Sequence, residues 1–277
     1  MTGTALQNYE ERWAQEAQRA AESEPLSGGT WLSARGGQLM IGDQALPGNQ
    51  AAVIVLDSIR ENTYYGTRFD PNAPLPPICY AIGRDADPLF PHTDMQKDLN
   101  YFKPQHVENG QVMGCDGCPL NEWGSAPQGR GKACQNRRRL TVIPAGYYVP
   151  KPGSRDFSLE LFDDPQHYQK TDIAFCKLPV TSVSNWAKYV NQLAANVRRP
   201  PHGVVTRLHI EPHQQHQYEM CFEMIDLVPD ELADVIMQRH DASVQMPLVG
   251  YQAPDMERLQ AAQGGGQLNG LRGGFQR

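Results

Sequence analysis

Apolar side chains recur at every fourth position near the start of the chain, at Tyr9, Trp13 and Ala17. This spacing places them on one face of a helix, so we expect a helix over residues 7–23 within an N-terminal helical arm of residues 1–27. The sequence SEPLSGG ends the predicted helix. The arm either packs lightly on the rest of the protein or binds a partner.

The next part of the chain has the short, alternating apolar runs of β-strands. Runs on either side of the pair Gly36-Gly37 predict a hairpin, and residues 53–56 form a continuous apolar run typical of a buried strand. A more polar strand carrying Tyr64 and Tyr65 follows. We therefore expect this portion to be all β.

Strands and helices mix after residue 150. Strand patterns occupy residues 154–163 and 171–179, and a helical apolar stripe ending before Pro200-Pro201 predicts a helix over residues 182–197. Two alternating runs over residues 203–226 predict a second hairpin, and Pro229 begins another helix pattern. The patterns together predict an α+β fold whose core spans residues 28–258.

Residues 70–155 interrupt these patterns with prolines and tight turns. A long irregular stretch inside a compact domain is uncommon and is usually functional. A bound metal supplies folding energy that a missing apolar core cannot. We therefore expect a metal-binding loop module inserted at about residues 79–139.

The cysteines of this module suggest the metal. Cys115 and Cys118 form a Cys-x-x-Cys knuckle, Cys134 follows sixteen positions later, and Cys79 stands upstream. Four thiolates make a complete tetrahedral shell for Zn²⁺, and the knuckle is the usual way to place two of them on one turn. We predict a structural zinc site formed by these cysteines.

Several alternatives to this site remain open. His92 or His106 can replace Cys79 as the fourth ligand, and the same cysteines can hold an iron–sulfur cluster. A catalytic zinc is disfavoured because four thiolates leave no position for water. Cys176 and Cys221 lie among apolar neighbours, and we interpret them as buried hydrophobic side chains.

Composition and charge narrow the class of protein. The 277 residues are 40% hydrophobic, enough for a core, and no apolar run is long enough for a membrane helix. The N-terminus lacks the apolar centre of a signal peptide, so we expect a cytoplasmic protein. The net charge is −6, yet residues 123–155 carry seven Lys or Arg and no Asp or Glu. This local basic stripe is typical of polyanion binding.

Basic and aromatic side chains in and around the module are the candidate nucleic-acid contacts. Basic groups follow phosphates, and exposed aromatic rings stack on bases. The predicted phosphate contacts are Arg130, Lys132, Arg137, Arg138 and Arg139. The predicted stacking residues are Trp123, Tyr64, Tyr65 and Tyr147.

Motifs for catalysis are missing from the sequence. The segment GRGKAC resembles a phosphate loop, but Ala133 follows the lysine where Ser or Thr should hold magnesium. His209, His213 and His216 cluster at the second hairpin, and we interpret them as a solvated turn in preference to a metal site. We therefore expect a protein that is not an enzyme.

The order of these segments resembles a group of phage-encoded, zinc-bearing single-stranded-DNA-binding proteins. The resemblance covers roughly residues 28–250, and its most specific part is CDGCPLNEWGSAPQGRGKACQNRRR, residues 115–139. It implies a β-barrel of the oligonucleotide-binding (OB) type with a zinc-ribbon-like module in a loop. Relatives of this kind often end in an acidic tail that recruits replication proteins. This chain instead ends in a Gly-rich segment, residues 259–277, which we expect to be flexible.

The sequence as a whole predicts a single-stranded nucleic-acid-binding protein that prefers DNA and reads no particular sequence. We expect it to act in phage DNA replication or recombination in the host cytoplasm, with replication proteins as partners and with self-association on DNA. The alternative is a structural or regulatory zinc protein, such as a virion component or a transcription regulator, that docks on a protein partner.

Overall fold

The computed structural model describes residues 31–246 except Asp43, 66–76, Ala86, 94–106, 109–110, Gln128, His216 and Gln245. The predicted N-terminal arm and the predicted Gly-rich tail lie outside the described residues. Within the described part, no helix is long and apolar enough to cross a membrane.

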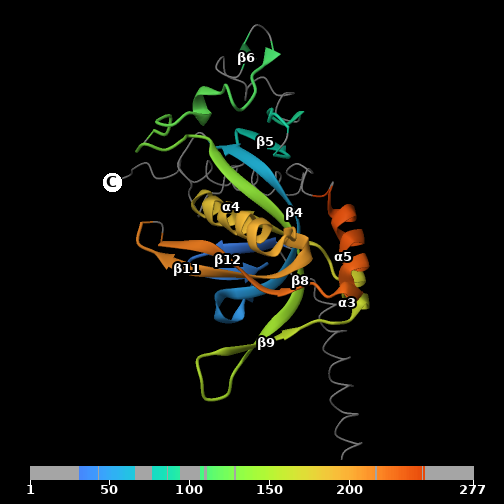
Figure 1. Ribbon diagram of the computed structural model, residues 1–277. Coiled ribbons are helices and arrows are strands. Elements are labelled where there is room, and N and C mark those ends of the chain that lie inside the picture. The colour runs from blue at the N-terminus through green and yellow to red at the C-terminus, as the bar shows by residue number, and fades with distance from the viewer. Residues whose placement is uncertain are drawn as a thin grey trace, which may run out of the picture.

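A ten-stranded sheet forms the centre of the protein (Figure 1). Its main path runs in the order β12-β11-β4-β8-β10-β1-β2-β3, with β5 beside β4 and β9 beside β8. All pairs are antiparallel except β1 with β10. The strands are β1 (Trp31–Arg35), β2 (Gln38–Ile41), β3 (Gln44–Ala45), β4 (Gln50–Tyr64), β5 (Cys79–Gly83), β8 (Gln135–Pro150), β9 (Phe157–Leu161), β10 (Ala174–Leu178), β11 (Val204–His213) and β12 (Gln217–Leu227).

The remaining elements are short. A separate two-stranded sheet pairs β6 (Val107–Glu108) with β7 (Gln111–Val112). The helices are α3 (Pro165–Lys170), α4 (Val183–Gln192) with a π-helical extension η5 (Leu193–Val197), and α5 (Asp230–Ser243). Single 3-10 turns are η1 (Pro47–Asn49), η3 (Pro119–Asn121), η4 (Val180–Ser182) and η6 (Pro201–Gly203).

Both predicted hairpins are confirmed. Gly36 and Gly37 join β1 to β2 with φ of 57° and 79°, a left-handed conformation that glycine adopts without a steric penalty. β11 and β12 pair over residues 204–227. The two successive strands expected over residues 53–65 are instead one strand, β4, with a register shift between Val55 and Asp57 where it pairs with β8.

Both faces of the sheet are covered, which explains why the central strands are apolar on both sides. On one face α4 and its extension η5 contribute Trp186, Tyr189 and Leu193 to a core shared with β1, β2, β4, β8, β10, β11 and β12. The helical stripe predicted for residues 182–197 is therefore confirmed, although Tyr189 was not part of it. The Tyr189 hydroxyl reaches the Thr206 hydroxyl of β11 at 2.6 Å, so its polar end is satisfied inside the core.

The second core lies on the opposite face, under α3 and α5. Tyr168 of α3 and Leu232, Val235 and Ile236 of α5 pack on Ile54 and its neighbours in β4 and β8. The two long strands β4 and β8 continue past these helices and carry the cysteine-bearing module at their ends (Figure 1). Two packed faces thus hold a rigid pair of strands on which the module is built.

The α+β class predicted from the sequence is confirmed. The sheet is open: among the described strands, no pairing joins β12 to β3 at the two ends of the path. The Tyr218 hydroxyl of β12 does donate to the Ala34 carbonyl of β1 at 3.0 Å, which brings the two halves of the curled sheet together at one point. A closed barrel of the OB type stays a prediction.

Candidate metal centre and the adjoining surface

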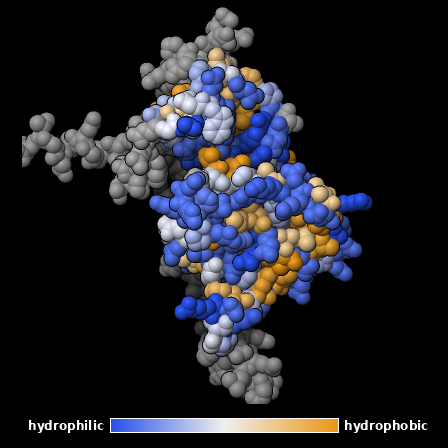
Figure 2. All heavy atoms as spheres, turned by 60° about the vertical axis from the view of Figure 1, so that its left-hand side comes forward, coloured by the Kyte–Doolittle hydropathy of each residue, from blue (hydrophilic) through white to orange (hydrophobic). Residues whose placement is uncertain are grey.

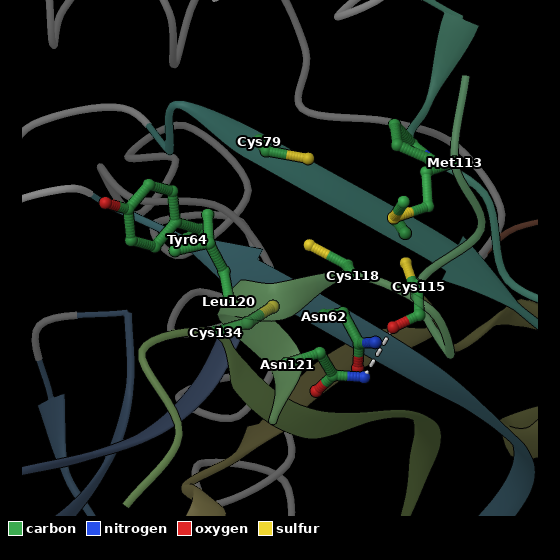
Figure 3. A pocket seen from close by; sticks show the side chains of 11 residues that line it. Asn62, Tyr64, Cys79, Met113, Cys115, Cys118, Leu120, Asn121 and Cys134 are labelled. Carbon is green, nitrogen blue, oxygen red and sulfur yellow. Dashed lines mark hydrogen bonds between the residues drawn. The ribbon is translucent and has the colours of Figure 1, made fainter. Parts of the chain in front are cut away.

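Three segments of the chain bring the four cysteines to one pocket (Figure 3). Cys79 opens β5 opposite Tyr64 of β4. Cys115 and Cys118 sit on a tight turn in which the Cys118 amide donates to the Cys115 carbonyl at 3.4 Å. Cys134 directly precedes β8, and its amide donates to the Leu120 carbonyl at 2.8 Å. The backbone therefore fixes all four positions.

The pocket is small and lined mainly by carbon and sulfur. Its other lining residues are Asn62, Tyr64, Ala81, Pro91, Met113, Leu120 and Asn121. Cys115 is buried and the other three cysteines are half-buried, and all four thiols are free. Apolar walls of this kind exclude water from a centre and strengthen charge interactions inside it.

Burial sets the protonation state of the thiols in the pocket. Burial, reinforced by repulsion from the neighbouring thiolates, raises the pKa of Cys79 and of Cys134 to about 12. Burial raises the pKa of Cys115 to about 11, against a hydrogen bond from Asn62 that lowers it. These thiols are thus neutral near pH 7 without a metal. A divalent cation among them reverses this preference, since coordination stabilises the thiolate form.

An asparagine network supports the cysteine knuckle. Besides its bond to the Cys115 sulfur, Asn62 accepts a hydrogen bond from the Asn136 amide at 2.7 Å. The Asn121 amide donates to the Cys115 carbonyl at 2.8 Å (Figure 3). Sequence reasoning missed these residues, because single asparagines in a strand or turn carry no recognisable spacing. Their hydrogen bonds fix the position of Cys115, as outer-shell partners do for the ligands in metal sites.

The donor set fits a structural zinc ion. All four pocket cysteines present sulfur, the ligand of closed tetrahedral zinc sites. Their sulfurs are spaced more loosely than in such a site, since no three of them lie within 4.8 Å of one another. Binding therefore requires the side chains to draw together.

The histidine alternatives differ in position. His92 does not line the pocket, and its Nδ1 lies 2.9 Å from the Tyr80 hydroxyl on which its ring stacks. His106 lies outside the described residues. The geometry thus favours Cys79 as the fourth ligand.

The loop between Cys118 and Cys134 presents an exposed aromatic ring beside a cation. Trp123 is 80% exposed, and the Lys132 ammonium lies 5.9 Å from its ring centroid. The loop folds on itself through hydrogen bonds that the Gly124 and Ala126 amides donate to the Gly131 carbonyl, at 3.0 and 3.1 Å. Arg130 is exposed on the same loop. Trp123, Arg130 and Lys132 therefore form one accessible group.

The three consecutive arginines have three different environments. Arg137 lies 6.0 Å from the Tyr65 ring centroid, in cation–π contact. Arg138 makes a bidentate ion pair with Asp85, with its two terminal nitrogens 2.5 and 2.8 Å from the carboxylate oxygens. Arg139 is 4% exposed and its Nε donates to Glu61 at 3.0 Å. The predicted role of Arg139 as a phosphate contact is withdrawn, because a guanidinium buried against a carboxylate cannot reach a phosphate.

Glu61 is a buried charge that the sequence did not reveal. It is fully buried, and Arg139 and Lys177 both pair with it, Lys177 at 2.5 Å. These three charged residues lie on three neighbouring strands, β4, β8 and β10. Two cations around one carboxylate leave a positive balance in the sheet just below the module.

The predicted stacking tyrosines do not form one surface. Tyr64 lines the cysteine pocket and Tyr65 lies under Arg137. Tyr147 is 49% exposed but lies near the opposite end of β8, where its hydroxyl donates to Glu160. Tyr147 is therefore too far along the strand to share a surface with the module, and we remove it from the proposed contacts.

Comparison of the chain with protein-family models, with curated proteins and with solved structures found no match. The resemblance to phage single-stranded-DNA-binding proteins thus stays a prediction.

Proposed function

We propose that the protein binds single-stranded nucleic acid, DNA in the first place, through a surface built on a structural zinc centre. We define the loop surface as Trp123, Arg130, Lys132, Arg137 and Tyr65. It keeps three of the five predicted cations and two of the four predicted aromatic residues. Binding of this kind tracks the phosphates and stacks bases without reading their sequence.

The zinc ion would be held by Cys79, Cys115, Cys118 and Cys134. Its chemistry there is structural: it neutralises the thiolates and ties the loop to the ends of β4, β5 and β8. Because the loop has almost no apolar core of its own, the position of the loop surface depends on this tie.

The exposure of Trp123 is the observation that carries the proposal. It is the most exposed of the large hydrophobic side chains described, and the others of this kind are half-exposed or less. The face drawn in Figure 2 is mainly hydrophilic, with its hydrophobic side chains gathered in a few patches. An indole held out in water beside a lysine is suited to stack on a base while the lysine pairs with the adjacent phosphate.

The proposal extends to the type of fold and to the process in which the protein acts. We propose that the curled sheet is an OB-type barrel that remains open, which the contact between Tyr218 and Ala34 supports. A role in phage DNA replication or recombination, with replication proteins as partners and with self-association along DNA, follows from the resemblance and not from the geometry.

Salt dependence tests the assignment of the loop surface. Each phosphate neutralised on a single strand contributes about −0.7 to the slope of log K against log salt. Replacing Arg130, Lys132 and Arg137 by Gln should therefore weaken binding and flatten the slope by about 2. A control with the same charge loss, Lys151, Arg155 and Lys188 to Gln, should keep the slope. Equal slopes in both triple variants would refute the assignment.

A protein-docking role is the second candidate, and the same exposed indole favours it. Buried tryptophans are common anchors of protein interfaces. This alternative predicts that the Arg130, Lys132 and Arg137 variant leaves oligonucleotide binding unchanged or that binding is absent from the start. It also predicts a stable complex with one protein partner that the Trp123→Ala substitution disrupts.

A further inference from the structure

A second group of metal-ligand side chains lies on the β11–β12 hairpin, away from the cysteine pocket (Figure 1). The strand register pairs His209 with Cys221 and Glu211 with Glu219. Side chains two residues apart on a strand, and those directly opposite on its partner, share one face. The hairpin therefore presents an imidazole, a thiol and two carboxylates on a single face.

Three of these groups already converge. The ligand atoms of His209, Glu211 and Cys221 all lie within 4.8 Å of one another. The His209 Nε2 is 3.1 Å from a Glu211 oxygen, and the Asn185 amide of α4 lies 3.8 Å from the Cys221 sulfur. This is a tighter cluster than the four cysteines make in the pocket.

Two carboxylates on this face of the hairpin lie directly opposite each other, whereas the neighbouring opposed pair has opposite charges. One step along the hairpin, Arg207 and Glu223 occupy opposing positions and form an ion pair at 3.1 Å. Glu211 and Glu219 oppose each other with like charges, which is destabilising for a directly opposed pair. The His209 Nδ1 is buried and has no hydrogen-bond partner among the described residues. A bound cation compensates the carboxylates and fixes the histidine tautomer.

We propose that His209, Glu211 and Cys221 form a second metal site, for zinc or a similar transition-metal ion. Imidazole nitrogen and thiolate sulfur exclude magnesium and calcium as the preferred ions, since these take oxygen ligands. Three protein ligands leave the fourth position of a tetrahedral ion open to water or another ligand, unlike the closed four-cysteine shell. The site thus keeps one ligand position that can exchange, and in this proposal His209 is a metal ligand and not part of a solvated turn.

Zinc content at a fixed free-zinc concentration tests the proposal. The full-length protein is dialysed to equilibrium, and bound zinc per chain is measured by mass spectrometry. We expect Glu211→Gln, His209→Ala and Cys221→Ser each to bind one zinc ion fewer than the wild type. Glu211 is 57% exposed, so its substitution should leave the fold intact even if the other two do not. Glu223→Gln, on the same face, is the matched control and should keep the full content.

Alkylation of Cys221 reports on this site specifically and is measured beside the zinc content. Zinc should slow alkylation of Cys221, measured on its own peptide, in the wild type and in Glu223→Gln but not in Glu211→Gln. Equal zinc content in the wild type and Glu211→Gln, or equal protection of Cys221 in both, would overturn the proposal. The variant Cys118→Ser separates the two sites: it should lose the zinc of the cysteine pocket and retain protection of Cys221.

Discussion

Replacing Trp123 by alanine is the sharpest single test of the loop surface. The side chain is 80% exposed, and the Lys132 ammonium lies 5.9 Å from its ring centroid. Removing it should therefore change the free energy of unfolding by less than about 0.5 kcal/mol, as for most surface substitutions. Any large loss of binding then reflects lost contacts with the nucleic acid and not a damaged fold.

The expected loss follows from stacking. One base stacked on an aromatic side chain contributes about 1 to 3 kcal/mol by alanine substitution. At about 1.4 kcal/mol per tenfold change, Trp123→Ala should raise the Kd about 5- to 140-fold.

The assay is a fluorescence-anisotropy titration of a labelled oligo-dT with each protein at one salt concentration. Tyr147→Ala is the control, because Tyr147 is an exposed aromatic residue near the other end of β8. It should leave the Kd unchanged, and urea denaturation should show that Trp123→Ala is folded. An unchanged Kd in Trp123→Ala, or an equal loss in both variants, would refute the reasoning.

Two further predictions concern stability. Glu61→Gln removes the carboxylate that pairs with the buried Arg139 guanidinium, and it should lower the free energy of unfolding, measured by urea denaturation, by about 3 to 5 kcal/mol. Asp85→Asn breaks a more exposed ion pair with Arg138 and should lower it by less than about 1 kcal/mol. The metal-free protein should lose stability as pH rises from 9 towards 12. Burial raises the pKa of Cys79 and Cys134 from 9.0 to about 12 in the folded protein, so these thiols ionise first in the unfolded chain and favour it. Zinc-loaded protein should keep its stability over that range and lose it on acidification, since protons then compete with zinc for the thiolates. An equal loss of stability at alkaline pH with and without zinc would contradict a metal centre.

The local pattern of apolar residues predicted much of the fold. The hairpin at Gly36-Gly37, the β11–β12 hairpin and the α4 stripe all rest on periodicity that a single segment displays, and each is confirmed. The continuity of β4 could not be foreseen, because its polar half is buried only by pairing with β5 and β8, which the chain reaches much later. Pairing partners and the openness of the sheet depend on tertiary contacts that no local pattern encodes.

The candidate site also contains residues that local sequence predicts and residues that only tertiary contacts define. Spacing alone identified Cys115 and Cys118, and composition added Cys134 and Cys79, which the structure brings to the same pocket. Sequence could not sort the run of three arginines, because adjacent residues on β8 point to opposite faces and meet different partners. Glu61, which decides the environment of Arg139, gave no signal as a lone acidic residue in a strand.

The most direct test of the central claim is a titration of metal-quantified protein with an unstructured oligo-dT at low and at moderate salt. The account predicts tight binding at low salt, clear weakening at moderate salt, and a loss of affinity when the cysteine-bound zinc is removed by Cys118→Ser. Zinc bound at the four cysteines with no oligonucleotide binding even at low salt would contradict it, and would leave the module as a scaffold for a protein partner.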